Sequence, residues 1–245
     1  MTTERTTEPG TTRQTTTTLI TGANKGLGYE TARRLKEQGH HVVIGARDAE
    51  KGRQAAEALG VDWVHLDVTS DASVSAATTE VEERFGGLDV LINNAGITGP
   101  DLAVDAVDGP ALTAVLDTNT VAVVRTTQAF LPLLRRSASP VIVNVSSGLG
   151  SFDVRADESR IEHSVPSLAY SASKAALNML TSVYAQFLPE IRINVVDPGY
   201  TATDLNGHSG PQTVTEGTDA VVAMASVGAD GPTGTFTDRH GALAW

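Results

Sequence analysis

The sequence predicts a single α/β domain built on a doubly wound parallel sheet with helices on both faces. From residue 18 onward, short runs of β-branched residues alternate with longer stretches of helical periodicity. Several of the short runs are almost continuously apolar, as strands are when helices cover both faces of a parallel sheet. The 245 residues show no internal repeat, and this length suits one large domain.

The expected elements follow a strand–helix rhythm, which implies right-handed crossover connections. Strands are expected over residues 18–21, 41–46, 61–66, 88–92, 141–145, 191–196 and 235–237. Helices are expected over residues 26–38, 49–59, 74–85, 111–135, 168–188 and 213–225. We expect residues 1–16, which are rich in threonine, to form a disordered tail, and residues 17–245 to form the one folded domain.

Composition and charge exclude several classes of protein. The net charge of −11 argues against a nucleic-acid-binding surface, which would need a basic face. No apolar run approaches the ~20 residues of a membrane span, and the N-terminal segment lacks the apolar stretch of a signal peptide. The chain has no cysteine, so disulfides and thiolate chemistry are excluded, and we expect no metal site. This composition fits a reducing compartment, and we expect a cytoplasmic protein.

The first expected strand runs into a glycine-rich turn and then into a helix. Glycines at such a turn let the backbone approach a pyrophosphate, whose charge then faces the helix N-terminus. The spacing differs from the common G-x-G-x-x-G fingerprint, and the turn alone is also compatible with a tight structural connection. We interpret it as the phosphate loop of a Rossmann-type, dinucleotide-binding domain. The residues expected to contact the cofactor here are Gly22, Asn24, Lys25, Gly26, Leu27 and Gly28.

The end of the second expected strand distinguishes between cofactors. A domain that selects NAD usually has an Asp or Glu about 20 residues past the glycines, to bind the ribose 2′-hydroxyl. Here Gly45, Ala46 and Arg47 occupy that position, which leaves room for a 2′-phosphate and offers a planar bidentate donor. Lys25 offers a second cation. Either cation alone is compatible with an exposed surface charge, but together they predict NADPH rather than NADH.

Two further segments follow expected strands at the same edge of the sheet. Asp67 is placed to accept a hydrogen bond from the adenine amine, with the backbone of Val68 beside it, although an N-cap role is also open. Asn94, Ala95 and Gly96 follow the fourth strand, and their small size permits close approach to a cofactor.

Tyr170 and Lys174 are the strongest candidates for catalysis. Their i, i+4 spacing places both side chains on one face of a helix. A neighbouring ammonium stabilises a phenolate, so we expect Lys174, together with an oxidised nicotinamide ring, to lower the pKa of Tyr170. The alternative is a tyrosine packed on the core beside a solvated lysine.

Polar residues at two other places complete the candidate site. Ser146 and Ser147 end a strand at the carboxyl edge, where open α/β sheets bind ligands and where a hydroxyl can polarise a carbonyl oxygen; serines also end strands for ordinary turn reasons. Asn119 lies in a long apolar helix, so its amide is either a satisfied core group or part of a buried proton path.

Taken together, these segments resemble the short-chain dehydrogenase/reductase family, in its compact single-domain branch. The motifs TGANKGLG, LDV, NNAG, NVSS, YSASK and PGYTAT stand in family order between residue 18 and the C-terminus. Within the family, NKG in the glycine loop and ARD after the second strand are most similar to the NADPH-dependent carbonyl reductases. The resemblance implies a dinucleotide-binding catalytic domain that transfers a hydride between NADPH and a ketone or aldehyde, or runs the reverse alcohol oxidation.

The resemblance also implies roles for individual residues. Ser147, rather than Ser146, would polarise the carbonyl, and Tyr170 would act as general acid. Lys174 would lower the pKa of Tyr170 and bind the nicotinamide ribose, and Asn119 would hold a water that links Lys174 to solvent. Contacts to the nicotinamide carboxamide and the pyrophosphate would come from Pro198, Gly199, Thr201 and Thr203.

One departure from the family concerns the spacing between Ser147 and Tyr170, which are about ten positions further apart than in many members. The extra segment, residues 152–167, is rich in charge and is expected to be mostly a solvated loop. In similar carbonyl reductases it covers part of the helix that bears Tyr170, a face that is an interface in most relatives. We therefore expect a monomer or homodimer rather than a tetramer.

The substrate cannot be read from the sequence beyond a small carbonyl compound or alcohol. Candidates to line its pocket are Ile97, Leu149, Phe152, His163 and Tyr200. The short segment 205–212 suggests an open cleft. Two alternatives to a carbonyl reductase are a dehydratase or epimerase on the same scaffold and a non-catalytic dinucleotide sensor. The sensor would be expected to have lost Tyr170 or Lys174, and both are present.

Overall fold

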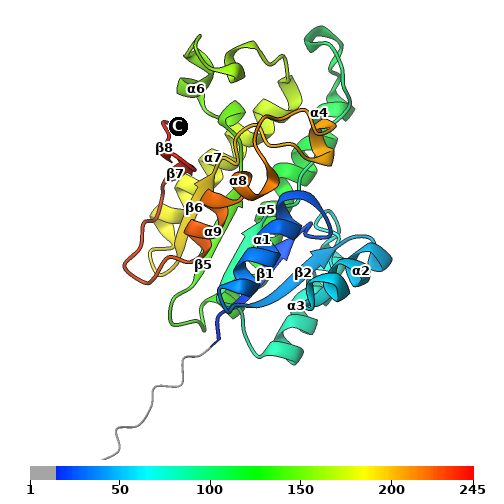
Figure 1. Ribbon diagram of the computed structural model, residues 1–245, viewed down its shortest axis with the longest axis vertical. Coiled ribbons are helices and arrows are strands. Elements are labelled where there is room, and N and C mark those ends of the chain that lie inside the picture. Colours follow the sequence, from blue (N-terminus) through cyan, green and yellow to red (C-terminus); the bar gives the residue numbers. More distant parts are fainter. Residues whose placement is uncertain (1–14) are drawn as a thin grey trace, which may run out of the picture.

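The computed structural model describes residues 15–245, whose centre is an eight-stranded sheet in the order β3-β2-β1-β4-β5-β6-β7-β8 (Figure 1). The strands are β1 (Thr17–Thr21), β2 (His41–Ala46), β3 (Asp62–His65), β4 (Val90–Asn93), β5 (Val141–Val145), β6 (Arg192–Val196), β7 (Phe236–Asp238) and β8 (Gly241–Ala242). β1 to β7 pair in parallel, and only β7 and β8 pair antiparallel. The winding direction reverses between β1 and β4, which confirms the doubly wound fold class.

The helices lie on both sides of this sheet. They are α1 (Gly26–Glu37), α2 (Ala49–Leu59), α3 (Asp71–Phe85), α4 (Gly109–Leu116), α5 (Ala122–Leu134), α6 (Phe152–Ala156), α7 (Leu168–Phe187), α8 (Val214–Gly217) and α9 (Asp219–Ala225). Short 3₁₀ turns cover Val104–Ala106, Gly148–Gly150, Ile161–Ser164 and Asp204–Asn206. Within residues 15–245, no helix is both long and apolar enough to cross a bilayer.

Side-chain alternation along the strands divides the core into two layers. Ile20 of β1 packs in the layer that contains apolar residues of α1, α2 and α9. Its neighbour Leu19 packs in the other layer, with apolar residues of α3, α5 and α7. Successive strand residues point to opposite faces, so the nearly continuous apolar strands are explained by burial on both sides.

Three sequence predictions require correction. The helix expected over 111–135 is interrupted by a π-helical turn, Asp117–Val121, which separates α4 from α5. The helix expected over 213–225 is divided at Thr218 into α8 and α9. Periodicity did not detect either break, because helical periodicity locates a helix without defining where its hydrogen-bond pattern changes. The antiparallel strand β8 was not predicted, since two residues carry no alternation signal. The tail predicted over 1–16 lies, except for its last two residues, outside the described residues.

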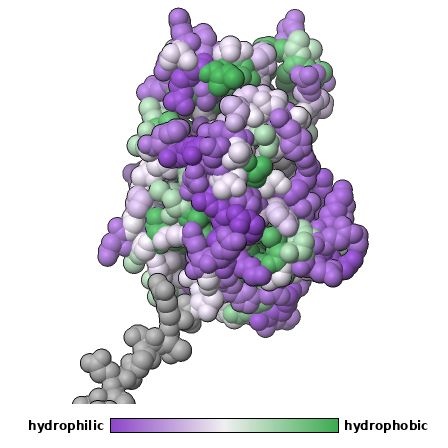
Figure 2. Space-filling view, in the orientation of Figure 1, coloured by the Kyte–Doolittle hydropathy of each residue, from purple (hydrophilic) through white to green (hydrophobic). Residues whose placement is uncertain are grey.

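Several loops rise above the carboxyl edge of the sheet (Figure 1). The segment 152–167 contains α6 and a 3₁₀ turn, with Val154 buried, so it is more ordered than the solvated loop predicted. Figure 2 shows apolar patches at this end, as well as others lower on the same face, among hydrophilic surface. The segment also carries Phe152, whose side chain is 81% exposed, and the exposed Ile161.

Candidate active site

The glycine-rich loop after β1 is held against the end of β4. Gly22 and Gly26 have left-handed backbone conformations, with φ of 63° and 57°, which glycine adopts without strain. A Cβ atom at Gly22 would lie only 2.9 Å from the Cα atom of Ala95. The Asn94 amide donates to the carbonyl oxygens of Thr21 (2.8 Å) and Gly22 (3.2 Å). The two segments therefore form one rigid wall.

The N-terminus of α1 faces the cleft bounded by this wall. Lys25 is its N-cap residue, and its side chain makes no capping hydrogen bond. The first backbone N–H groups of a helix have no partner within the helix, and they favour an anion. The bare glycine surface and these amides fit the pyrophosphate of a dinucleotide.

One open cleft brings together most of the predicted cofactor residues. It is lined by Gly22, Asn24, Lys25, Gly26, Leu27, Gly28, Arg47, Asp67, Val68, Asn94, Ala95, Gly96, Tyr170, Lys174, Pro198 and Thr203. Gly199 and Thr201 are not among the lining residues. Thr201 is buried, and its hydroxyl donates to the carbonyl oxygen of Pro198 (3.0 Å) and to Gln212 (3.2 Å).

The two predicted phosphate-binding cations have different surroundings. Arg47 is exposed after the end of β2. Lys25 forms an ion pair of 2.9 Å with Asp204, which lies on the other side of the cleft and is also paired with His208 (2.9 Å). Arg47 is therefore the better placed cation, while Lys25 has a competing carboxylate that the sequence did not reveal.

Asp67 forms a local turn at the far end of the cleft. Its carboxylate accepts from the backbone N–H (3.0 Å) and the hydroxyl (2.7 Å) of Thr69. Partial burial opposes ionisation, but these hydrogen bonds and the charge of Arg47 hold the pKa of Asp67 below its ordinary value. The N-cap of α3 is Ser70, so the N-cap alternative for Asp67 is wrong.

Helix α7 carries Tyr170 and Lys174 into the opposite end of the same cleft. Lys174 is buried, and its ammonium donates to the carbonyl oxygen of Val145 (2.8 Å). The same ammonium lies 5.4 Å from the centre of the Tyr170 ring. The solvated-lysine alternative is therefore wrong.

The ionisation of this pair in the cofactor-free protein is governed by burial. Burial raises the pKa of Tyr170, the charge of Asp197 raises it further, and the Ser147 hydroxyl only partly opposes them. Burial lowers the pKa of Lys174 to about 8, against the opposing influence of Asp197. The lowering of the Tyr170 pKa by Lys174 together with an oxidised nicotinamide ring stays a prediction for the cofactor-bound enzyme.

The two serines after β5 have separate environments. Ser146 is buried, and its hydroxyl donates to Asn178 (2.6 Å), which in turn donates to the carbonyl oxygen of Gly150 (3.1 Å). Ser147 is the N-cap of the 3₁₀ turn that follows, and its hydroxyl accepts from the backbone N–H of Leu149 (3.2 Å). Ser146 is among the residues that line the cleft and Ser147 is not, so what keeps Ser147 as the candidate serine is its hydroxyl beside Tyr170.

Asn119 lies in the π-helical turn. Its side chain accepts from the N–H of Ile97 (2.8 Å) and donates to the carbonyl oxygen of Ile97 (2.8 Å) and the hydroxyl of Ser173 (2.9 Å). Both N–H groups of the amide are used and its oxygen keeps one acceptor position, and the amide ties α4–α5 to the loop after β4 and to α7. π-helical turns are frequent at functional sites, because the extra residue displaces backbone carbonyl groups.

The five predicted substrate-pocket residues do not converge. Ile97 lines the cofactor cleft. Leu149 and Phe152 line a groove on the outer face of α7, and Tyr200 lines a third cavity beside Gly199. His163 is exposed, with a ring nitrogen bonded to the carbonyl oxygen of Arg155 (3.0 Å).

Other residues of the cleft were missed by sequence reasoning. They are Leu66, Thr69, Thr118, Val145, Asp204 and Leu205. Each is within two positions of a predicted residue, so proximity in sequence was the only available signal. Their side chains enter the cleft through local backbone geometry, which residue type does not encode.

Comparisons with known proteins agree with this architecture. The family model of the short chain dehydrogenases matches residues 16–213. The chain belongs to the short-chain dehydrogenase family. It is therefore an oxidoreductase enzyme, and the predicted family resemblance is confirmed.

The dehydrogenase has curated relatives along nearly its whole length. It is 32% identical to (−)-isopiperitenone reductase of Mentha piperita, with 92% of this chain and 97% of that protein covered. It is 31% identical to salutaridine reductase of Papaver somniferum, with 94% and 96% covered. Among solved structures, an NADPH-bound carbonyl reductase from chicken fatty liver superposes with a TM-score of 0.83 and 29% identity, covering 95% of this chain and 100% of that one.

Proposed function

We propose that the enzyme reduces a ketone or aldehyde with NADPH, and that it also catalyses the reverse oxidation of an alcohol. The observation that carries the proposal is the position of Tyr170 and Lys174 in the same cleft as the glycine-rich loop and the N-terminus of α1. A hydride donor bound along this cleft would lie beside a proton donor, which is the arrangement that carbonyl reduction requires.

The chain's own residues supply the proton and the electrostatics. Ser147 and Tyr170 donate hydrogen bonds to the carbonyl oxygen as negative charge develops there. Tyr170 then protonates the alkoxide, and its raised pKa keeps it protonated at neutral pH. Lys174 holds the ribose beside Tyr170. Asn119 binds the backbone of Ile97 and the hydroxyl of Ser173, and in this proposal it would also hold a water that links Lys174 with solvent.

NADP(H) is the cofactor in this proposal. Arg47 follows β2 where an NAD-selective domain has an acid, and the exposed guanidinium suits a 2′-phosphate. The NADPH-bound carbonyl reductase from chicken and a short chain dehydrogenase from Shigella flexneri complexed with NADP support this choice. NADH is the weaker alternative. Bound NADPH supplies the hydride.

Replacement of Tyr170 tests the proposal. Tyr170→Phe removes the proton donor and keeps the ring, so we expect carbonyl reduction to fall by about 10²–10⁴-fold, while NADPH affinity changes little. The measurements are NADPH oxidation over a panel of ketones and aldehydes, and NADPH binding by fluorescence. Tyr184→Phe, on the same helix and outside the cleft, is the control and should retain activity. Full activity of Tyr170→Phe would contradict the proposed mechanism.

We also propose a substrate class, a cellular location and an oligomeric state for the enzyme. The partner is a small carbonyl compound or alcohol, in keeping with the names of the relatives, with neither nucleic acid nor membrane involved. The lack of cysteine supports a cytoplasmic location. A monomer or homodimer is favoured over a tetramer, because segment 152–167 and α7 line a common groove at the start of α7.

A further inference from the structure

A buried amide on α7 holds the turn that contains Ser147. Asn178 lies one helical turn after Lys174 and is only 4% exposed. Its side chain accepts from the hydroxyl of Ser146 (2.6 Å) and donates to the carbonyl oxygen of Gly150 (3.1 Å). Ser146 directly precedes Ser147, and Gly150 is the last residue of the 3₁₀ turn. One amide therefore bridges both ends of this turn.

The chemistry of the two partners fixes the direction of both hydrogen bonds. A carbonyl oxygen can only accept, so the amide nitrogen of Asn178 must face Gly150. The amide oxygen then faces Ser146, whose hydroxyl has one proton to donate. The other acceptor near that hydroxyl, the carbonyl oxygen of Lys174, is further away at 3.5 Å. A carboxylate at position 178 would turn an oxygen toward the Gly150 carbonyl, and an apolar side chain would bind neither partner, so the position requires an amide.

The turn packs directly on the backbone of α7. A Cβ atom at Gly150 would lie only 2.6 Å from the carbonyl carbon of Lys174, so this contact has room for glycine alone. The N–H of Gly150 donates to the carbonyl oxygen of Ser147 (2.9 Å). The glycine has no side chain that could hold the turn on the helix. The Asn178 amide supplies that attachment from the helix side.

We propose that Asn178 is a positioning residue of the active site, whose amide holds the Ser147 turn against α7 and so sets the distance between the hydroxyls of Ser147 and Tyr170. The inference rests on the proposed function, because it takes these two hydroxyls as the groups that bind the carbonyl oxygen. Asn178 is not among the residues that line the cofactor cleft. Its replacement should therefore slow the chemical step and leave NADPH affinity nearly unchanged.

Single-turnover kinetics tests this role. Asn178→Leu nearly keeps the side-chain volume and removes both hydrogen bonds. The rate of NADPH oxidation in a single turnover should fall by about 10–100-fold, since a misplacement of about 1 Å can cost about 10²-fold. The Kd for NADPH should stay within about twofold. The same experiment is run with the best ketone or aldehyde of the panel.

Thr181→Val is the matched control. Thr181 is also buried on α7, and its hydroxyl accepts from the amide of Asn144 in β5 (2.9 Å). It lies almost one turn further along the helix and contacts the strand rather than the turn. Loss of this buried hydrogen bond should lower the melting temperature, as in Asn178→Leu, and should leave the single-turnover rate unchanged.

Hydrogen exchange of the cofactor-free protein tests the bridge without turnover. The Gly150 amide is expected to be protected by its bond to Ser147. Asn178→Leu should speed its exchange by at least about tenfold through local opening of the turn, and Thr181→Val should not. Ser146→Ala deletes a single oxygen atom and breaks the same bridge, so it should speed the exchange in the same way.

Gly150 exchange that Ser146→Ala leaves unchanged overturns the inference, whether or not Asn178→Leu folds. A single-turnover rate that Asn178→Leu leaves unchanged also overturns it. So does an equal loss of rate in Thr181→Val, because a loss shared with the control reports general stability. A wild type without NADPH-dependent reduction instead overturns the proposed function, and the exchange measurement still decides whether Asn178 holds the turn.

Discussion

At the scale of single residues, the active site contains a charged side chain, Lys174, whose burial destabilises the folded protein. Lys174 is buried with a pKa of about 8, and its ammonium has one carbonyl hydrogen bond among the described residues. Below pH 8 the folded and the unfolded chain both carry this proton, and the folded form bears the cost of desolvating it. The cost decreases as pH rises from 8 toward the ordinary lysine value of 10.5. Function and stability therefore conflict at this residue.

Replacement of Lys174 by methionine should relieve the conflict. We expect Lys174→Met to raise the free energy of unfolding of the cofactor-free protein by on the order of 1–2 kcal/mol at pH 7, with a smaller gain at pH 10. Denaturant unfolding at both pH values measures this. Lys36→Met is the matched control, because Lys36 also donates to a carbonyl oxygen (Leu59, 2.6 Å) but is exposed. An equal gain in the control would show that burial is not the cause.

We expect Arg47 to determine the preference for NADPH over NADH. Arg47→Asp would place a carboxylate where the ribose 2′-hydroxyl of NADH can be bound and a 2′-phosphate is repelled. The ratio of kcat/KM for NADPH to that for NADH should fall by at least about tenfold, which corresponds to about 1.4 kcal/mol. Steady-state kinetics with both cofactors gives the ratio. An unchanged ratio would mean that the 2′-phosphate binds elsewhere.

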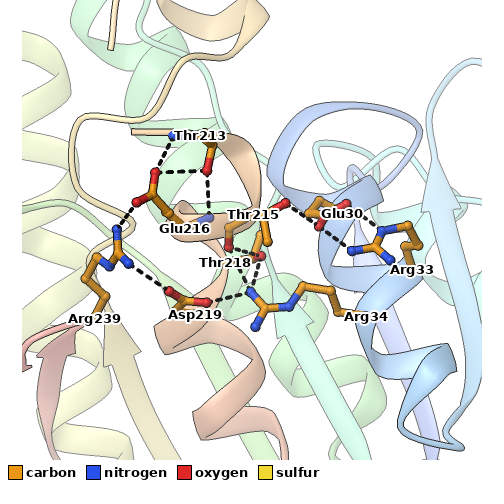
Figure 3. Close-up of polar contacts among 9 residues, drawn as sticks. All are labelled: Glu30, Arg33, Arg34, Thr213, Thr215, Glu216, Thr218, Asp219 and Arg239. Atoms are coloured by element: carbon orange, nitrogen blue, oxygen red, sulfur yellow. Dashed lines mark hydrogen bonds and ion pairs between the residues drawn. The ribbon is translucent and has the colours of Figure 1, made fainter. Parts of the chain in front are cut away.

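At the scale of elements, a polar network fastens the helices that follow the cleft-lining loop (Figure 3). Arg34 of α1 donates to the carbonyl oxygen of Thr215, to the hydroxyl of Thr218 and to Asp219, each at 2.8 Å. Arg239, in the β7–β8 turn, pairs with Glu216 (2.7 Å) and Asp219 (3.4 Å). Arg34 and Arg239 thus both contact the residues around the break between α8 and α9. These contacts anchor the C-terminal end of the segment that begins at Thr203.

Arg34 should contribute more to stability than an ordinary surface arginine. Arg34→Ala removes the charged donor of the Thr215 carbonyl and the Thr218 hydroxyl and leaves Asp219 with Arg239 alone, and we expect a loss of about 1–3 kcal/mol in the free energy of unfolding. Arg53→Ala is the control, because Arg53 on α2 makes only exposed pairs with Glu50 and Glu57 and should cost less than about 1 kcal/mol. Similar losses from the two variants, measured by urea unfolding, would contradict a special role for the network.

At the scale of the whole molecule, we expect the outer face of α7 to be the surface on which copies of the chain associate. Met179 and Phe187 are 66% and 70% exposed on this helix. The groove at the start of the same helix is shared with Phe152 and Arg155 of segment 152–167. An apolar face of this kind favours association, while the segment restricts what fits against it.

We expect purified protein to have the mass of one or two chains rather than four. Light scattering coupled to size-exclusion chromatography measures this mass. If the outer face of α7 joins two copies, Met179→Glu should convert a dimer to monomer, whereas Ser75→Glu, at an exposed polar position of α3, should not. A tetramer in solution would contradict the expectation.

The sequence by itself determined the wound sheet and most of the cofactor cleft. The features that the sequence predicted are local patterns: apolar strands, glycines at a strand–helix turn, and Tyr170 and Lys174 one helical turn apart. Such patterns can be predicted from sequence, because they depend on backbone sterics and on the periodicity of neighbouring residues. Only the tertiary structure decided the pairing of Lys25 with Asp204 and the hydrogen bonds of the Asn119 amide with Ile97 and Ser173. These contacts join residues distant in sequence, and desolvation, which sets the pKa values of Tyr170 and Lys174, depends on everything packed around a group rather than on its neighbours in the chain.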